Sequence, residues 1–310
     1  MDMATFARRS EAPDGIARMT GHGPADTTAV TRALVLGGGG VAGIAWEIGI
    51  LRGVADVRPT LLPRLISADL IVGTSAGAAV AAQITSGVDL DTLYAAQLQQ
   101  DTGEIEVDFD DDLQRAQFAA ATAGASSAQH ARQRIGALAL KTHGVDESTR
   151  RAAVAARLPV HRWPDQDLIV TAVDIETGKL QKFTRHSGVD LIDAVSASCA
   201  VPGVWPAVTI GQRKYMDGAM RSTTNADLAA GADRVLIIAP SLNVSATPYN
   251  DLDTELERLK PTAVLVVHAD ERSLAAFGTN PLSPATRAPA ARAGRLEGQR
   301  YASAIATAWH

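Results

Sequence analysis

Short apolar runs alternate with helical patterns along the chain, and this alternation predicts the fold class. Runs with the length and β-branched composition of buried strands occur at 33–36, 70–72, 168–173, 234–239 and 262–267. Between the first two, apolar residues recur at helical spacing, as at Ile44, Ile48, Leu51 and Val54. Strands that alternate with helices predict an α/β fold, with a largely parallel central sheet flanked by helices on both faces.

Composition divides the chain into three parts, with an insertion inside the second. Residues 1–30 are polar and dotted with Gly and Pro, which predicts a flexible N-terminal extension. The main domain is expected at 31–272, and within it the Ala-, Gln- and charge-rich segment at about 89–160 predicts a helical insertion or cap. Residues 273–310 are expected to form a helical tail that packs on or trails the domain, with a Pro- and Arg-rich interruption near 284–293.

The bulk numbers exclude several classes of protein. The 310 residues are 46% hydrophobic and 20% charged, with a net charge of −5 and no basic stripe, so no nucleic-acid partner is expected. The single Cys199 leaves no internal disulfide and no cysteine-based zinc site, and it is expected to be a small buried core residue. No run of 18 apolar residues and no secretory signal is present, which predicts a cytoplasmic protein.

A strand-to-helix turn carries the strongest chemical signal. Ser75 lies in Gly-x-Ser-x-Gly, directly after the apolar run 70–72 and before an Ala-rich segment that favours a helix. Gly73 and Gly77 have no Cβ, so the backbone can crowd there and leave the serine hydroxyl exposed. A serine presented in this way can attack an acyl carbon.

Acyl transfer by a serine also needs a base and donors for the oxyanion, and two segments offer them. Gly38, Gly39 and Gly40 follow a strand and open a helix, so their N–H groups can point into one concavity as an oxyanion hole. Asp217 ends an extended segment before Gly218 and is the candidate base. It would need an apolar setting to raise its pKa toward the working range. A helix is expected after it, to about residue 231.

Three motifs in order resemble one known family. Gly38-Gly39-Gly40-Val41-Ala42-Gly43 resembles a Gly-Gly-Gly-x-Arg-Gly turn, Gly73 to Gly77 match the serine motif, and Asp217-Gly218-Ala219 matches an Asp-Gly-Ala motif. The stretch from Ala197 to Gly203 is also similar to the segment that precedes the aspartate. Between Arg32 and Ala239 the chain therefore resembles the patatin-like phospholipase family.

The resemblance implies a patatin-like three-layer sandwich that hydrolyses acyl esters of lipids without metal or cofactor. It implies a Ser75–Asp217 dyad, with Gly43, Gly73, Gly77 and Gly218 as supporting motif residues. The substrate is expected to be a lipid or related acyl ester. The helical insertion is expected to shield the acyl chain and touch membrane surfaces transiently, although no basic amphipathic face favours firm binding. Oligomeric state is left open.

Ala42 departs from the family pattern, since a basic residue is usual there. This departure leaves a non-catalytic ligand-binding or regulatory protein on the same scaffold as one alternative. Transfer of the acyl group to an acceptor other than water is another.

Other readings of single features also stay open. Gly38-x-Gly40-x-x-Gly43 matches the dinucleotide fingerprint, but the acidic residue that this fingerprint requires on the next strand is missing. Ser75, Asp217 and His268 have the chain order of a Ser-Asp-His triad. The acidic cluster Asp108, Asp110, Asp111 and Asp112 lacks the ligand spacing of a calcium loop, and a solvated cap loop is expected instead.

Overall fold

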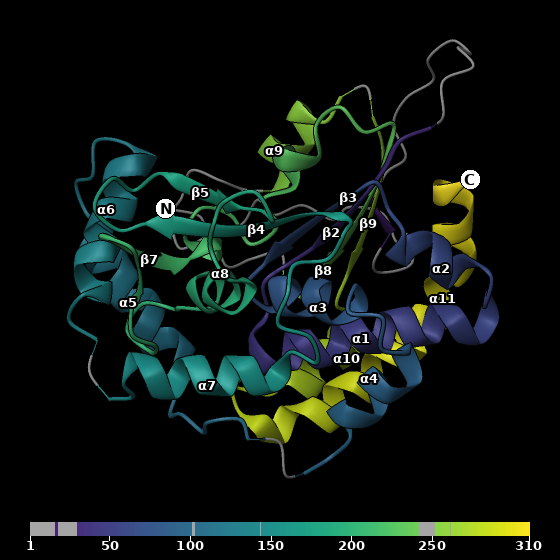
Figure 1. Cartoon of the computed structure of the whole chain (residues 1–310), viewed down its shortest axis with the longest axis horizontal. Coiled ribbons are helices and arrows are strands. Elements are labelled where there is room, and N and C mark those ends of the chain that lie inside the picture. Colours follow the sequence, from purple (N-terminus) through teal and green to yellow (C-terminus); the bar gives the residue numbers. More distant parts are fainter. Residues whose placement is uncertain (1–15, 18–29, 101–102, 143, 242–251, 261) are drawn as a thin grey trace, which may run out of the picture.

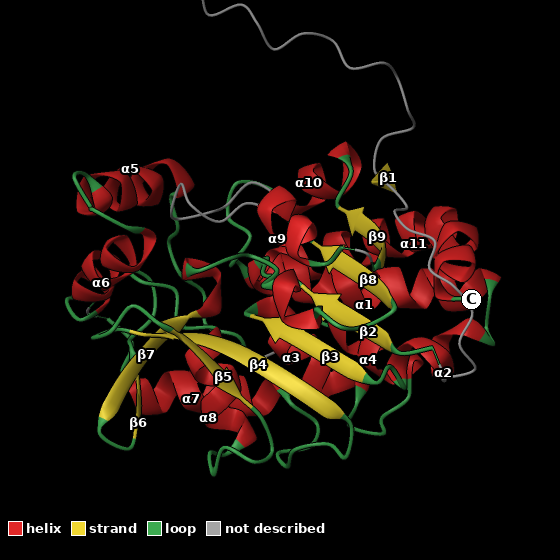
Figure 2. Cartoon of the chain, turned by 90° about the horizontal axis from the view of Figure 1, so that it is seen from above, coloured by secondary structure: helices red, strands yellow, loops and turns green. Residues whose placement is uncertain are grey.

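The computed structural model describes residues 16–17, 30–100, 103–142, 144–241, 252–260 and 262–310 (Figure 1). These residues form one sheet of nine strands in the order β1-β9-β8-β2-β3-β4-β7-β6, with β5 paired to β4 (Figure 2). The strands are β1 (Ile16–Ala17), β2 (Arg32–Leu36), β3 (Leu70–Thr74), β4 (Asp167–Asp174), β5 (Leu180–Phe183), β6 (Val208–Ile210), β7 (Arg213–Asp217), β8 (Arg234–Ala239) and β9 (Ala263–His268). The five strands from β9 to β4 run parallel, whereas β1, β5, β6 and β7 pair antiparallel. The predicted α/β class with a largely parallel sheet is confirmed.

Helices connect the strands and cover both faces of the sheet. The α-helices are α1 (Gly40–Val57), α2 (Leu61–Ile66), α3 (Ala76–Ile84), α4 (Leu90–Gln97), α5 (Asp111–Thr122), α6 (Ala128–Ala139), α7 (Glu147–Arg157), α8 (Leu191–Ser198), α9 (Leu252–Arg258), α10 (Glu271–Phe277) and α11 (Arg287–Trp309). Short 3₁₀ helices are η1 (Gly218–Met220), η2 (Ala226–Ala229) and η3 (Pro284–Thr286). In Figure 1, α1, α3, α4 and α11 lie on one side of the sheet and α9 on the other.

Alternation along the central strands builds two apolar cores. On β2, Leu34 and Leu36 pack into the core formed with α1, α3, α8 and α11, whereas Ala33 and Val35 pack into the core formed with η2 and α9. Successive side chains of a strand point to opposite faces, so a strand that is apolar at every position needs a helical layer on each side. The continuous apolar runs in the sequence are explained by this three-layer arrangement.

Helix α11 is part of the main core rather than a loose tail. Its Gly294 and Gly298 face α1 so closely that an added Cβ would lie 2.3 Å from the Trp46 carbonyl oxygen and 2.1 Å from that of Ile50. The Trp46 indole N–H donates to the Glu297 carboxylate across this interface, at 2.9 Å. Packing this close to a neighbouring backbone requires glycine on one of the two helices, and it fixes α1, which begins at the glycine-rich loop.

Residues 89–160 contain α4, α5, α6 and α7, and the part of this range that the structure describes has no strand. Helices α5 and α6 stand at one end of the sheet beside β7 (Figures 1 and 2). Asp110 caps α5 by accepting a hydrogen bond from the Leu113 N–H, which is a structural role for one member of the acidic cluster. The predicted extension at 1–30 lies outside the described residues, except for Ile16–Ala17, which pair with β9, and residue 30.

Two local predictions are wrong. The helix expected from Gly218 to residue 231 is replaced by η1, an irregular loop and η2, since Asn225 adopts a left-handed conformation with φ 50° and its side chain bonds the neighbouring backbone. The interruption expected near 284–293 lies earlier, at 278–286 between α10 and α11, because α11 already begins at Arg287. Pro289 lies in the first turn of that helix, where a missing N–H costs nothing.

Candidate active site

Ser75 lies at the strained turn between β3 and α3. Its φ is 53° and its ψ is −114°, a conformation that an L-residue adopts only where surrounding contacts enforce it. The Ser75 N–H donates to Ser198 Oγ at 2.8 Å, and the Cys199 thiol lies 3.3 Å from the Ser75 carbonyl oxygen. Burial raises the pKa of the Cys199 thiol to about 11, which disfavours the reactive thiolate form, and Cys199 lies in the core as the sequence predicted.

The two glycines of the serine motif allow this turn to pack against its neighbours. An added Cβ at Gly77 would lie 2.1 Å from the Leu36 carbonyl oxygen, and one at Gly73 would lie 2.6 Å from the Ala78 Cα. The Gly77 N–H also donates to the Gly37 carbonyl oxygen at 2.8 Å. The serine turn follows β3 and the glycine-rich loop follows β2, and these contacts hold the two segments together at the same edge of the sheet.

Asp217 is the hydrogen-bond partner of Ser75. The Ser75 hydroxyl donates to Asp217 Oδ2 at 2.7 Å, and Oδ1 accepts the Ala219 N–H at 2.8 Å. Asp217 ends β7, which pairs antiparallel with β4, and its side chain is fully buried. Gly218 makes this approach possible, since a Cβ there would lie 2.3 Å from Thr171 Oγ1. Two residues 142 positions apart in sequence are therefore in direct contact.

Burial gives this carboxyl group the basicity that a catalytic base needs. Desolvation raises the pKa of Asp217 from its usual 3.8 to about 7, against the hydrogen bonds from Ala219 and Ser75 and the nearby positive charge of Arg150, which lower it. A carboxylate with a pKa near neutrality accepts a proton far more readily than an exposed one. Asp217 thus has the buried setting that the sequence analysis required to raise its pKa.

The same pKa shift predicts a cost to stability. A carboxyl group with a raised folded-state pKa stabilises the protein below its unfolded pKa, and this contribution is lost as pH rises through about 7. Asp217→Asn, which keeps the shape without the charge, is therefore expected to melt at a higher temperature than the wild type. The advantage grows from about pH 4 to pH 7 and is constant above. Each pKa unit is worth about 1.4 kcal/mol, so a gain of a few kcal/mol is the upper bound.

Thermal melts of both proteins between pH 4 and pH 9 measure this difference. Asp174→Asn serves as the comparison, because the pKa of Asp174 is lowered by its hydrogen bonds to Thr177 and Arg213, and its replacement should destabilise instead. An Asp217→Asn variant that melts below the wild type at pH 8 would contradict the buried-charge interpretation.

The glycine-rich loop offers fewer free donors than the sequence suggested. The Gly38 N–H donates to the Thr223 carbonyl oxygen at 2.8 Å, so it is already occupied. Among the described residues, the N–H groups of Gly39, Gly40 and Ala76 have no hydrogen-bond partner. Ala76, the residue after the serine, was missed by the sequence analysis, although its position is a usual source of an oxyanion donor.

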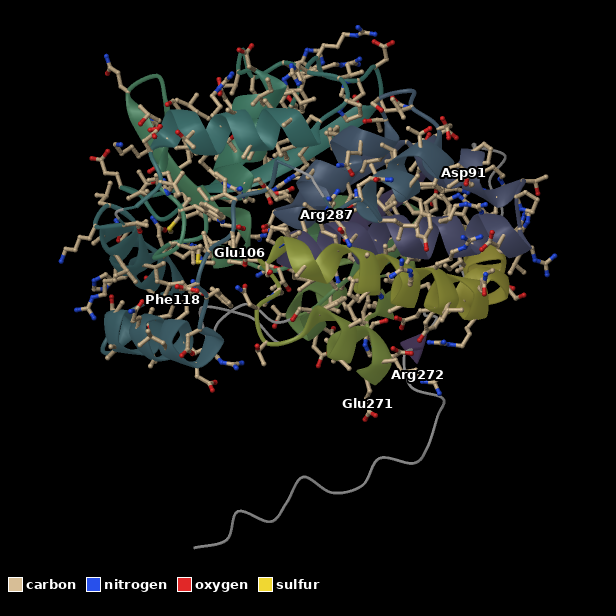
Figure 3. The ribbon with its side chains drawn as sticks, turned by 90° about the horizontal axis from the view of Figure 1, so that it is seen from below. Asp91, Glu106, Phe118, Glu271, Arg272 and Arg287 are labelled. Carbon is tan, nitrogen blue, oxygen red and sulfur yellow. The ribbon has the colours of Figure 1, made fainter. Side chains whose placement is uncertain are left out.

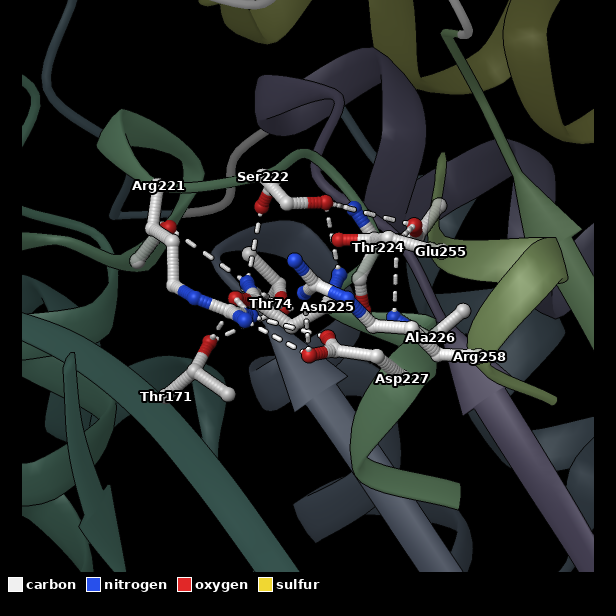
Figure 4. A network of polar contacts seen from close by, with 11 residues as sticks. Thr74, Thr171, Arg221, Ser222, Thr224, Asn225, Ala226, Asp227, Glu255 and Arg258 are labelled. Carbon is white, nitrogen blue, oxygen red and sulfur yellow. Dashed lines mark hydrogen bonds and ion pairs between the residues drawn. The ribbon is translucent and has the colours of Figure 1, made fainter. Parts of the chain in front are cut away.

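A polar network beneath the site fixes the loop that carries Thr223 (Figure 4). Asn225 Nδ2 donates to Thr74 Oγ1 at 3.1 Å and to the Ser222 carbonyl oxygen at 2.7 Å, and Asn225 Oδ1 accepts from Arg221. Glu255 Oε2 accepts from Thr224 Oγ1 and from the Ala226 N–H. The network joins the end of β3, beside Ser75, to the segment that follows Asp217. It therefore fixes the position of Ser75 relative to Asp217.

Three neighbouring spaces lie at the site, and Ser75 lines two of them. The first is a cleft of about 690 Å³ lined by the glycine loop, Ser75, Asp217 and a set of apolar side chains: Phe109, Phe118, Val201, Met220, Leu274, Phe277 and Leu282. The second is a neck of about 20 Å³ that contains Ser75, Cys199 and Val201. The neck shares Val41, Ile44 and Arg157 with the third space, an inner pocket of about 330 Å³.

The neck also contains a cation that the sequence analysis missed. Arg150 of α7 is buried, with its guanidinium carbon 3.7 Å from the centroid of the Trp205 ring, and both side chains line the neck with Ser75. Arg157 faces the same space but is paired with Glu104 at 2.6 Å. Arg287, at the start of α11, also lines the inner pocket (Figure 3). Nothing in the sequence around Arg150 separates it from the surface arginines of the same helix.

His268 is not placed to complete a triad. It ends β9, which is three strands from β3 in the sheet, or about 14 Å at usual strand spacing. Its Nδ1 lies 3.3 Å from the Ala269 carbonyl oxygen. The described residues include no group of His, Cys, Asp and Glu side chains arranged to hold a metal ion. None of the described helices is long and apolar enough to cross a membrane.

Comparisons with known proteins give one family match and several structural neighbours. A family model described as Patatin-like phospholipase matches residues 34–230. VipD from Legionella pneumophila is 12% identical with a TM-score of 0.45, over 89% of this chain and 67% of VipD. Human GIVD cytosolic phospholipase A2, solved with methyl γ-linolenyl fluorophosphonate, is 8% identical with a TM-score of 0.42, over 90% of this chain and 58% of that protein.

The type III effector protein ExoU is 16% identical with a TM-score of 0.33, over 88% of this chain and 53% of ExoU. This chain therefore spans little more than half the length of two of these three proteins. A comparison with curated proteins finds no match.

Proposed function

Because this chain belongs to the patatin-like phospholipase family, we propose that it hydrolyses carboxylic esters of lipids through an acyl-enzyme on Ser75, with Asp217 as the base. The observation that carries the proposal is the 2.7 Å hydrogen bond from the Ser75 hydroxyl to a fully buried carboxyl group, at the floor of a large cleft. A nucleophile and base within hydrogen-bond reach are the geometric requirement for such a reaction.

The reaction balances with these two side chains and water. Ser75 Oγ bonds to the ester carbonyl carbon while its proton passes to Asp217 Oδ2. The tetrahedral intermediate then collapses, the ester C–O bond breaks, and the leaving alcohol takes the proton from Asp217. Water next gives a proton to the same carboxylate and attacks the acyl-enzyme. The bond between the acyl carbon and Oγ breaks, the acid leaves, and Ser75 regains its proton.

The N–H groups of Gly39, Gly40 and Ala76 support the charge that develops in each step. Their lack of partners among the described residues leaves them free to donate to the oxyanion, and α1 and α3 both begin at this point. One such donor is typically worth about 2.7–4 kcal/mol of transition-state stabilisation. In the present conformation Gly38 is not one of these donors, because its N–H is bonded to the Thr223 carbonyl oxygen.

The lining of the cleft supports a lipid acyl chain as the substrate group. Phe118 of α5, Met220 and Phe277 of α10 supply apolar surface to the cleft. Leu274 also lines the cleft and is 49% exposed. Apolar side chains at the mouth of an acyl site favour transient contact with a lipid surface. Helix α5 belongs to the helical insertion at 89–160 and contributes Phe118 to the lining of the cleft, as expected of a cap that shields the acyl chain.

The pH dependence of hydrolysis tests the role of Asp217. The carboxyl group must be ionised to accept the serine proton, and its pKa is about 7. For a neutral ester, kcat/KM is therefore expected to rise about tenfold per unit below pH 7 and to level off above it. Stopped-time assays with p-nitrophenyl octanoate from pH 5 to pH 9 measure this profile. A rate that is constant down to pH 5 would show that the base is an ordinary, exposed carboxylate or a different group.

A substrate panel tests the proposed function itself. Release of fatty acid from phospholipid, monoacylglycerol and p-nitrophenyl ester substrates is expected from the wild type. Added short-chain alcohols separate hydrolysis from acyl transfer, since an acyltransferase would form the new ester in preference to the free acid. A folded protein that releases no acid from any of these esters would contradict the proposal.

A further inference from the structure

We propose that Arg150 forms an anion-binding subsite beside Ser75 and selects ester substrates that carry a phosphate or carboxylate group close to the scissile ester. This inference rests on the proposed function, because it names the substrate class of the same site. It assigns a recognition role to a residue of α7, far in sequence from the serine, aspartate and glycine motifs.

Arg150 is built into the site rather than lying on the surface. Its relative exposure is 6%, and the only described ring contact of its guanidinium is the face of Trp205 at 3.7 Å. Both Nε and Nη1 are buried without a hydrogen-bond partner among the described residues. A buried guanidinium with unsatisfied donors costs free energy, and such groups persist mainly where a ligand completes them.

The Arg150 guanidinium has no partner of opposite charge in direct contact among the described residues. Its neighbour Arg157 is also cationic, but that charge is matched by Glu104, which accepts at 2.9 and 2.6 Å. Burial and Arg157 lower the pKa of Arg150 to about 10, partly offset by Cys199, Glu104 and Asp217, so the guanidinium stays protonated at neutral pH. No carboxylate among the described residues pairs with it directly. The neck therefore carries a positive charge within reach of an anion.

The position of the neck defines where that anion must be. Arg150, Trp205 and Ser75 line the same space of about 20 Å³. This neck shares lining residues with the apolar cleft, Ser75 among them, and with the inner pocket, Arg157 among them. An ester bound at Ser75 with its acyl chain in the cleft would place its alcohol part toward the neck. A phosphate or carboxylate on that alcohol, a few bonds from the ester oxygen, would meet the free N–H groups of Arg150.

The uncharged side chain of Ala42 also supports Arg150 as the residue that binds the anion. The side chain at this position in the glycine loop is fully buried in the main core and carries no charge. Gly40 and Val41, the residues before it, line the neck together with Arg150. The described part of the site thus receives its unpaired positive charge from α7, and not from the glycine loop.

A matched pair of esters tests the proposal. The anionic ester is 3-octanoyloxy-4-nitrobenzoate, and the neutral one is its methyl ester, which has the same acyl chain and nitrophenol. Arg150→Met is expected to lower the anionic-to-neutral ratio of kcat/KM about ten- to hundredfold, since a hydrogen bond to a charged group is worth about 1.5–3 kcal/mol. The loss should appear mainly in the KM of the anionic ester. Arg150→Lys should restore part of the ratio, and Arg151→Met, on the same helix but paired with Asp193, should leave it unchanged.

The ratio separates this role from an effect of Arg150 on Asp217. Arg150 lowers the pKa of Asp217, so its loss should shift the pH profile of both esters equally. The ratio at each pH cancels that shift. Equal loss on both esters, or an unchanged ratio, would overturn the proposal.

Binding without turnover separates this inference from the proposed function. Octyl phosphate carries the anion on an apolar chain and has no carboxylic ester. It is expected to raise the melting temperature of the wild type, Ser75→Ala and Arg151→Met, but not of Arg150→Met; octanol is the neutral control. Hydrolysis of neither ester, with binding of octyl phosphate intact, would contradict the function and leave the anion site standing. Equal stabilisation of Arg150→Met by octyl phosphate would contradict the anion site.

Discussion

Ser75→Ala is expected to lower the hydrolysis of a neutral octanoyl ester by about 10⁴-fold or more, because removal of the nucleophile stops the acyl-enzyme route entirely. Ser75 Oγ makes one hydrogen bond to a described side chain, to Asp217, and supports no other part of the fold. The variant should therefore keep its fold and its secondary structure. Initial rates at pH 8, with active protein quantified by folded fraction, measure the loss.

Asp217→Asn is the matched partner of this experiment. It leaves the serine hydroxyl in place, keeps an acceptor for the Ala219 N–H and removes only the base. Its rate should fall nearly as far as that of Ser75→Ala, and the double variant should lose little more, since the two residues act as a unit. Multiplicative losses in the double variant would show that Ser75 and Asp217 work independently.

Gly77→Ala is expected to unfold or strongly destabilise the protein, although alanine is the better helix former. The added Cβ would lie 2.1 Å from the Leu36 carbonyl oxygen and 2.3 Å from its carbonyl carbon, both backbone atoms of a central strand. Helix α3 would have to move away from β2, which also breaks the hydrogen bond from the Gly77 N–H to Gly37. Overpacking of a core costs about 1–3 kcal/mol and more where backbone must move, so a fall in melting temperature of roughly 10 °C is expected.

Gly87→Ala provides the comparison for this loss. Gly87 has a φ of +83° but nothing within 4 Å of an added Cβ, so only the conformational cost of about 1–2 kcal/mol applies. Activity should survive at Gly87 and fall at Gly77, since a displaced α3 also displaces Ser75. Equal melting temperatures for the two variants would contradict the close packing of the serine turn on β2.

The sequence was informative where chemistry is local. The serine turn, the glycine-rich loop and the Asp-Gly turn each follow from short-range rules, and parallel strands bring their carboxyl ends to one edge of the sheet. The pairing of Ser75 with Asp217 was implied by the family resemblance and not by these rules, because Asp217 ends β7, which runs antiparallel to β4. The apolar run of each central strand likewise predicted a sheet buried on both faces.

Contacts made over long sequence distances could not be predicted in the same way. Gly38 was expected to donate to the oxyanion, yet its N–H is taken by Thr223, nearly two hundred residues away, on a loop that was expected to be helical. That loop departs from a helix because Asn225 bonds its own backbone, which propensity alone does not reveal. Arg150 was indistinguishable from Arg151 in sequence, and only the packing of α7 against Trp205 separates them.

The proposed hydrolysis requires that Ser75 is a nucleophile activated by Asp217. Intact-protein and peptide mass spectrometry after treatment with a neutral alkyl fluorophosphonate tests it most directly, since the reagent bonds only to an activated serine. One adduct per chain is expected, on the peptide that contains Ser75, with labelling absent in Ser75→Ala and at least a hundredfold slower in Asp217→Asn. An unlabelled Ser75 in the folded wild type, or labelling of Asp217→Asn at the wild-type rate, would contradict it.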